Sequence, residues 1–209
     1  RFFKMQKAEP GQLPLILKKV KKTISGYGLI QENDTIITSV SGGPDSVFLV
    51  HALYLLKDIL KIKLLCFHLD HKTRNGESAL DAEFVKKYCS SLGLRLISYE
   101  VDAKKWSQEN RLSFQDGARK LRLKLLNEAA EASGAAKIAT GHTASDSVET
   151  FILNLLRGTG LTGLSGIAPK NGNVIRPLID LYRSEILRYL DKHEIKYRID
   201  KTNIENKYA

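Results

Sequence analysis

Residues 36–50 read IITSVSGGPDSVFLV, and this stretch decides the fold. A β-branched run leads into two glycines, then into a mostly apolar segment of helical length, which predicts a buried strand, a tight turn and a buried helix. The glycines let backbone N–H groups approach an anion, and a helix N-terminus favours negative charge, so the pattern indicates a phosphate site. The spacing to a Lys-Ser/Thr pair that a Walker loop requires is absent. A plain turn with Ser46 as an ordinary helix cap is the alternative.

Composition sets the broad class. The chain has 209 residues, 43% of them hydrophobic, which suits one α/β domain with a sizeable core. Neither an apolar run long enough to cross a membrane nor a signal peptide is evident, so we expect no membrane partner. Cys66 and Cys89 lack the spacing of a disulfide or metal framework, which favours a reducing, cytoplasmic location.

The net charge of the chain bears on its binding partners. The net charge of +10 suggests a polyanionic partner beyond one nucleotide, although a lysine-rich solvated surface would give the same balance.

Strands and helices are expected to alternate along the chain. Expected strands are 36–40, 62–69, 94–101, 137–140 and 174–175, and expected helices are 13–24, 45–56, 78–92, 113–133, 145–155 and 182–192, with a polar stretch around Trp106. This alternation predicts a Rossmann-like, doubly wound parallel sheet with helices on both faces. We expect a single catalytic domain over 1–209, with 1–30 as an N-terminal helical extension.

Three polar clusters follow expected strands, at 41–46, 68–74 and 141–149. Ligands in such folds bind beyond the carboxyl ends of the strands. The clusters should therefore converge on one site.

The cluster at 141–149 contains an acid pair. Asp146 and Glu149 are three residues apart in the first turn of a helix that Ser145 is expected to cap, so both carboxylates share a face. The apolar residues Val148, Phe151, Ile152 and Leu155 are expected to face the core. Acids in a first turn can simply complement the helix dipole. With His142 just before them, a site for an ammonium group or Mg²⁺ is the stronger interpretation.

Histidines and arginines complete the candidates. His68 and His71 lie at a strand end suited to lining a nucleotide base pocket, and no further ligand pair at zinc spacing accompanies them. Arg119 and Arg122 are i, i+3 neighbours that could form a phosphate or RNA clamp or a surface salt bridge. Residues 158–163 match G-x-G-x-x-G but follow a helix, so we interpret them as a loop and not as a dinucleotide site.

Taken together, these motifs resemble a known family. The Ser-Gly-Gly-x-Asp-Ser loop is similar to that of the N-type ATP pyrophosphatases, the PP-loop family. Five further motifs occur in order: HLDHxxR at 68–74, ARxxR at 118–122, GHTxxDxxET at 141–150, RGTGLxGL at 157–164 and RPL at 176–178. With the loop, they resemble the tRNA(Ile)-lysidine synthetase family. By this resemblance, a further C-terminal tRNA-binding part is expected that 1–209 does not contain.

The resemblance implies a ligase reaction. ATP and Mg²⁺ would adenylate the wobble cytidine of an isoleucine tRNA with a CAU anticodon, and free lysine would then displace AMP. It implies phosphate contacts from Ser41, Gly42, Gly43, Pro44, Asp45 and Ser46, nucleotide contacts from His68 and His71, and catalytic roles for Asp45, His142 and Arg122. Substrate contacts would come from Asp146, Glu149, Arg119, Arg157 and Arg176, and Mg²⁺ would lie near Asp45, with Asp146 as an alternative ligand. The oligomeric state stays open, a homodimer included.

Three other functions are compatible with parts of this sequence. A related enzyme could thiolate tRNA, but such enzymes use cysteine pairs or an iron–sulfur cluster, and this chain has two isolated cysteines. A synthetase that amidates a small molecule fits the basic balance poorly. A non-catalytic adenine-nucleotide sensor would leave Asp45, Asp146 and Glu149 without an evident purpose.

Overall fold

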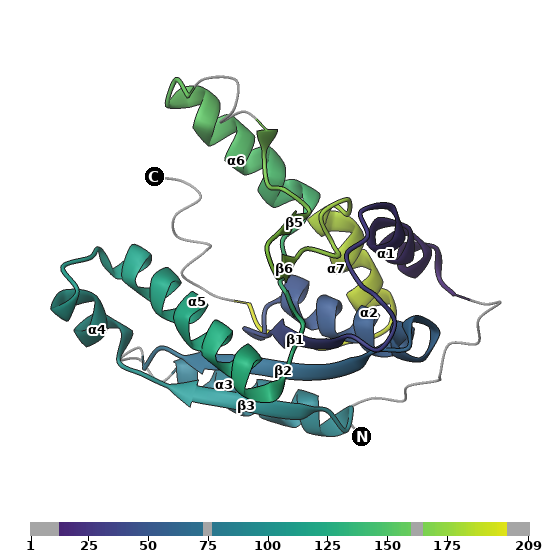
Figure 1. The fold of residues 1–209 in the computed structure, drawn as a ribbon, viewed down its shortest axis with the longest axis horizontal. Coiled ribbons are helices and arrows are strands. Elements are labelled where there is room, and N and C mark those ends of the chain that lie inside the picture. The colour runs from purple at the N-terminus through teal and green to yellow at the C-terminus, as the bar shows by residue number, and fades with distance from the viewer. Residues whose placement is uncertain (1–12, 73–76, 160–164, 200–209) are drawn as a thin grey trace.

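The fold is built on one six-stranded sheet (Figure 1). A computed structural model describes residues 13–72, 77–159 and 165–199. The strands are β1 (Thr35–Ser39), β2 (Lys63–Asp70), β3 (Arg95–Glu100), β4 (Lys137–Ala139), β5 (Lys170–Asn171) and β6 (Val174–Ile175), in the order β3-β2-β1-β4-β6-β5. All neighbours are parallel except the antiparallel pair of β5 and β6. The predicted parallel sheet is confirmed, whereas the short edge strand β5 was not predicted.

Helices cover both faces of the sheet, as predicted (Figure 1). They are α1 (Leu15–Gly26), α2 (Pro44–Leu60), α3 (Glu77–Ser91), α4 (Ala103–Glu109), α5 (Phe114–Ser133), α6 (Ala144–Leu156) and α7 (Arg183–Lys192). Helices α1, α2, α3 and α7 share one core cluster, and α4 and α5 share the other. Neighbouring strand residues alternate between them: Ile36 belongs to the first cluster and Ile37 to the second, as the two-residue period of a strand requires.

Helix α4 lies in the polar stretch for which no helix was predicted. It is seven residues long and too polar to show an apolar period. Its start does carry a signal, because the Asp102 side chain accepts a hydrogen bond from Lys105 N at 2.9 Å.

Helix α6 corrects two predictions. Its N-cap is Thr143 and not Ser145: the Thr143 side chain accepts a hydrogen bond from Asp146 N, and Asp146 answers in a capping box. The apolar residues predicted to face the core are exposed, and α6 contains no buried residue. In Figure 1 the helix extends away from the sheet. Apolar periodicity predicts an amphipathic helix but cannot say what covers its apolar side.

Removing apolar side chains from α6 should therefore cost this chain little stability. Leu155 and Leu156 are 56% and 78% exposed, whereas Leu126 in α5 is 1% exposed. We expect Leu155→Ala and Leu156→Ala to change the free energy of unfolding by less than about 0.5 kcal/mol. The matched control Leu126→Ala should lose about 2–5 kcal/mol, because it leaves a cavity. Urea unfolding measures all three, and a loss at Leu155 equal to that at Leu126 would mean that α6 packs within the chain.

Candidate active site

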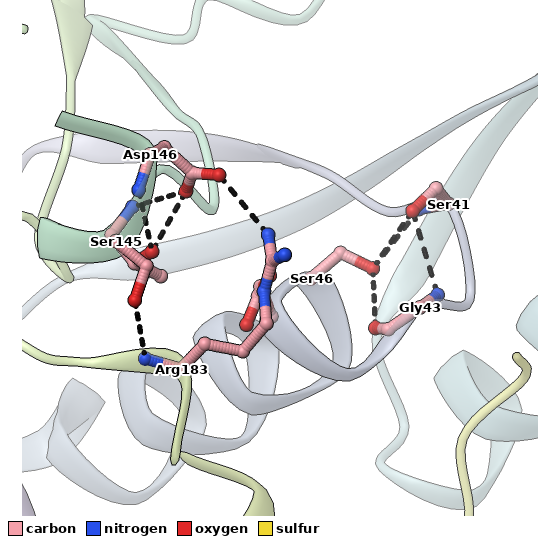
Figure 2. A network of polar contacts seen from close by, with 8 residues as sticks. Ser41, Gly43, Ser46, Ser145, Asp146 and Arg183 are labelled. Atoms are coloured by element: carbon pink, nitrogen blue, oxygen red, sulfur yellow. Dashed lines mark hydrogen bonds and ion pairs between the residues drawn. The ribbon is translucent and has the colours of Figure 1, made fainter. Parts of the chain in front are cut away.

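The predicted phosphate loop connects the carboxyl end of β1 to the first turn of α2. Ser46 Oγ accepts a hydrogen bond from Ser41 N at 3.2 Å and donates one to Gly43 O at 2.9 Å, so the loop is closed by its own hydroxyl (Figure 2). Pro44 occupies the start of α2, and no side chain caps that helix. The first amides of α2 are therefore available to an anion.

Two glycines shape the surroundings of this loop, Gly42 through its backbone conformation and Gly141 through a close approach. Gly42 has φ +92°, in the region that favours glycine, and a Cβ there would lie 3.5 Å from Phe84 in α3. A Cβ on Gly141 would lie 3.2 Å from Asp45 C and 3.3 Å from Ser46 N. The turn after β4 is thus packed directly on the backbone of the phosphate loop, which brings the predicted clusters at 41–46 and 141–149 together.

Arg183, at the start of α7, links these two clusters. Its Nε donates to Asp45 Oδ2 at 2.9 Å. Its Nη2 donates to Asp146 Oδ1 at 3.0 Å, the contact that Figure 2 shows between these two residues. Its backbone N donates to Ser145 Oγ at 3.1 Å. No sequence prediction included Arg183. A signal was present, because an arginine at the N-terminus of a helix opposes the helix dipole and needs a compensating partner.

Asp45 is short of partners for a carboxylate. Its side chain is 16% exposed, and its Oδ1 is buried without a hydrogen-bond partner. Burial raises the pKa of Asp45 above its ordinary value, the neighbouring Arg183 charge works in the opposite direction, and Asp146 adds to the rise. Burial therefore destabilises the ionised form of Asp45, and a further cation beside Oδ1 would stabilise it.

The acids of α6 differ in their surroundings. Asp146 uses Oδ2 to accept from Thr143 N at 2.7 Å and from Thr143 Oγ1 at 2.8 Å, which leaves Oδ1 for Arg183. Glu149 is exposed and lies about one turn further along α6. It is close enough to Arg183 to raise the pKa of the arginine. Asp146 is thus fixed by the fold, and Glu149 faces solvent beside it.

The carboxylates of the site can hold Mg²⁺ only together with substrate phosphates. Among the described residues, no group of three or more His, Cys, Asp or Glu side chains is arranged around a metal position. Mg²⁺ is commonly held by one or two carboxylates together with substrate phosphates and waters. The unpartnered Asp45 Oδ1, beside a phosphate loop, satisfies that requirement.

The two histidines after β2 have different surroundings. His68 is buried, with its Nδ1 2.7 Å from Val40 O, and so links β2 to the start of the phosphate loop. His71 lies 3.3 Å through Nε2 from Arg122 Nη2. Burial, together with the charge of Arg122, lowers the pKa of His71 to about 4, so His71 is neutral at neutral pH.

Four basic side chains influence one another at this edge of the sheet: Arg119, Arg122, Arg176 and His142. Burial lowers the pKa of His142, and all three arginines lower it further. Arg176 is held by its Nη1 donating to Ala168 O at 2.6 Å, while its buried Nε has no partner. Such mutual repulsion is relieved by an anion, which suits an RNA or nucleotide phosphate.

Some predicted residues lie elsewhere. Arg157 ends α6, about 16 Å along the helix from Asp146, and is not brought to the phosphate loop. Arg74 and most of the glycine loop at 158–164 lie outside the described residues.

Two further observations bear on rival interpretations. Cys66 and Cys89 are free and buried in one core cluster, where their side chains are hydrogen-bonded to each other, so the prediction that they are isolated is wrong. In the described part of the chain, no helix is long and apolar enough to span a bilayer.

A parallel α/β sheet with a glycine-rich phosphate loop at its switch in strand order defines a nucleotide-binding domain. The sequence profile of the PP-loop domain matches residues 14–209. The chain belongs to the PP-loop domain family, as the loop motif predicted.

The chain is also similar to curated enzymes. It is 41% identical over 194 residues to the tRNA(Ile)-lysidine synthase of Caldanaerobacter subterraneus subsp. tengcongensis, covering 93% of this chain and 42% of that protein. The tRNA(Ile)-lysidine synthase of Clostridioides difficile is 41% identical over 196 residues, with the same coverage of 93% and 42%. The predicted resemblance is confirmed, and the chain spans 42% of the length of these relatives.

Solved structures support the fold. The U34-tRNA thiolase NcsA from Methanococcus maripaludis, with its [4Fe-4S] cluster, matches with a TM-score of 0.69 and 22% identity over 88% of this chain and 63% of that one. The NH3-dependent NAD synthetase from Campylobacter jejuni matches with a TM-score of 0.55 and 16% identity over 93% of this chain and 75% of that one. At these identities the likeness concerns the fold alone.

Proposed function

We propose that this chain is the catalytic domain of an enzyme that uses ATP to join lysine to the wobble cytidine of an isoleucine tRNA. The observation that carries the proposal is the meeting of the phosphate loop and the acid pair around Arg183, beside a basic cluster. The similarity to tRNA(Ile)-lysidine synthases over 93% of the chain supports the choice of substrates.

In the first step, the C2 carbonyl oxygen of the cytidine attacks the α-phosphorus of ATP. A P–O bond forms to the base, the bond to the β-phosphate breaks, and pyrophosphate leaves. The uncapped N-terminus of α2 and the amides of 41–46 would hold the departing pyrophosphate. Bound Mg²⁺ would supply neutralisation of phosphate charge, with Asp45 as the residue that holds it.

In the second step, an amine of lysine attacks C2 of the cytidine, a C–N bond forms, the C–O bond to AMP breaks, and the amine loses a proton. Asp146 and Glu149 would pair with a positively charged ammonium group of lysine, since both carboxylates lie at the base of α6 beside the phosphate loop. The basic cluster of Arg119, Arg122, Arg176 and His142 would contact the nucleotide and the RNA.

The rival reactions fit the site less well. Thiolation with a cysteine pair or an iron–sulfur cluster would need thiols at the carboxyl edge of the sheet, whereas Cys66 and Cys89 are buried in the core. A small-molecule synthetase gives no purpose to three arginines at the same edge.

The test is AMP release with bulk tRNA and each of the twenty amino acids in turn. We expect release that needs both tRNA and lysine. Release without tRNA would favour a small-molecule synthetase, and release that needs a sulfur donor would favour thiolation. Binding of ATP without any AMP release, in the presence of all components, would favour a nucleotide sensor.

A further inference from the structure

Arg183 occupies the position in the site where a cationic ligand is expected. The guanidinium binds Asp45 at 2.9 Å and Asp146 at 3.0 Å, and these acids come from different elements, α2 and α6. Its side chain is 47% exposed, so it is not locked in the core. Figure 2 shows it between the first turn of α6 and the start of α2.

Its position in α7 is unfavourable without these acids. Arg183 is the first residue of α7, where the helix dipole repels a cation. Partial burial also opposes the charge, but Asp45 and Asp146 outweigh it and raise the pKa of Arg183. The arginine and the acids therefore stabilise one another.

The acids, however, are not saturated by Arg183. Asp45 Oδ1 stays buried without a partner while Oδ2 accepts from Arg183. Asp146 directs Oδ2 to Thr143, so only Oδ1 is free for a cation. A metal ion or an ammonium group placed between the acids could reach Asp45 Oδ1, which the guanidinium leaves unpaired.

We propose that Arg183 is a resident counter-ion: it offsets the charges of Asp45 and Asp146 and holds them in place while no cationic ligand is bound, and it leaves them when the ligand arrives. Arg183 is thus a positioning residue that sets the affinity of the site for cations. The inference rests on the proposed function only in the identity of the cation, which would be Mg²⁺ or the ammonium group of lysine.

This arrangement makes an unusual prediction, that removing a polar side chain tightens binding. A cation must displace Arg183, so its apparent affinity is its intrinsic affinity multiplied by the fraction of molecules in which Arg183 does not occupy the acids. Arg183 makes two ion pairs with these acids, and an ion pair with a solvent-exposed partner is worth up to about a fivefold change in affinity. Arg183→Gln should therefore bind the cation about threefold to thirtyfold more tightly than the unchanged chain.

The experiment uses the 209-residue chain without ATP or tRNA. Binding of Mn²⁺ alone is measured by electron paramagnetic resonance, and binding of lysine by calorimetry, with norleucine, which lacks the side-chain ammonium, as the control ligand. The variants are Arg183→Gln, Arg183→Lys and the control Arg188→Gln, an exposed arginine of the same helix. Circular dichroism checks that each is folded.

Tighter Mn²⁺ binding by Arg183→Gln would show that Arg183 competes with a metal ion for the acids. Tighter lysine binding with norleucine unchanged would identify a site for the side-chain ammonium group, and tighter binding of both amino acids a site for the α-ammonium group. Each of these results supports the proposal if Arg188→Gln is unchanged. In Arg183→Lys the charge is kept, but a lysine side chain reaches one acid at a time, so cation binding should tighten by a smaller factor. If Arg183→Gln does not fold, the cation affinity of Arg183→Lys tests the proposal instead. Unchanged or weaker binding of both cations by the folded variants would overturn the proposal. Because no turnover is measured, that failure is separate from a failure of the proposed ligase reaction.

Discussion

A folded Asp45→Asn variant is expected to lose AMP and pyrophosphate formation by roughly a hundredfold or more. Asp45 is the acid of the phosphate loop, and its buried Oδ1 is the atom best placed to support a cation beside the phosphates. Loss of one well-placed electrostatic contact in a catalytic site typically costs about 10²–10³ in rate. The measurement is release of AMP and pyrophosphate in the presence of ATP, tRNA and lysine.

The same substitution should leave the fold intact, which separates activity from stability. Burial raises the pKa of Asp45 in the folded chain, so folding favours the neutral form of this carboxyl. The stability that it contributes is therefore present at low pH and lost as pH rises through the raised pKa. At neutral pH an uncharged isostere removes the cost of the buried charge, although it also weakens the contact with Arg183. We expect the melting temperature to stay close to that of the unchanged chain.

A matched control is Asp58→Asn, on the exposed side of the same helix. It should retain full activity. Turnover by Asp45→Asn at the rate of this control would exclude Asp45 from the chemistry.

The phosphate loop was predictable because its shape depends on residues that are close together in the sequence. Two glycines, a proline at the first helical position and a serine that closes the turn act within six residues, so sequence alone specifies them. The convergence of 41–46 with 141–149 was also predictable, because the carboxyl ends of parallel strands meet at one edge. Gly141 then allows the close approach that makes this convergence tight.

What the sequence could not specify depends on distant partners. The apolar residues of α6 have the period of a core helix, and only the packing of the chain shows that they stay exposed. Arg183 lies 138 residues from Asp45 and 37 from Asp146, and nothing local to α7 names those partners. The N-cap of α6 was misassigned by two residues because Thr143 and Ser145 are both good caps, and the choice depends on the start of α7, which uses Ser145 Oγ instead.

The second large effect is expected at Glu149, which should govern the affinity for lysine. Among the acids at the site, Glu149 is exposed and is not part of the capping box, so Glu149→Gln changes the charge presented to a ligand without disturbing the helix end. A charge-assisted hydrogen bond is worth about 1.5–3 kcal/mol, so the KM for lysine should rise by about tenfold to a hundredfold. Adenylation of the tRNA, followed as pyrophosphate release without lysine, should continue. Glu131→Gln, an exposed glutamate of α5, is the control.

Asp146→Asn should behave differently, and the contrast tests the division of labour between the two acids. Asp146 accepts from Thr143 N and Oγ1 and binds Arg183, so its replacement weakens the start of α6 and frees Arg183 from one of its acids. We therefore expect a lower melting temperature together with a raised KM for lysine, and a fall in adenylation as well if Asp146 shares the metal. Glu149→Gln should show the change in lysine KM alone. If both variants use lysine at the concentrations that suffice for the unchanged chain, lysine is recognised by other residues, and the acid pair serves only to hold Arg183 and the first turn of α6.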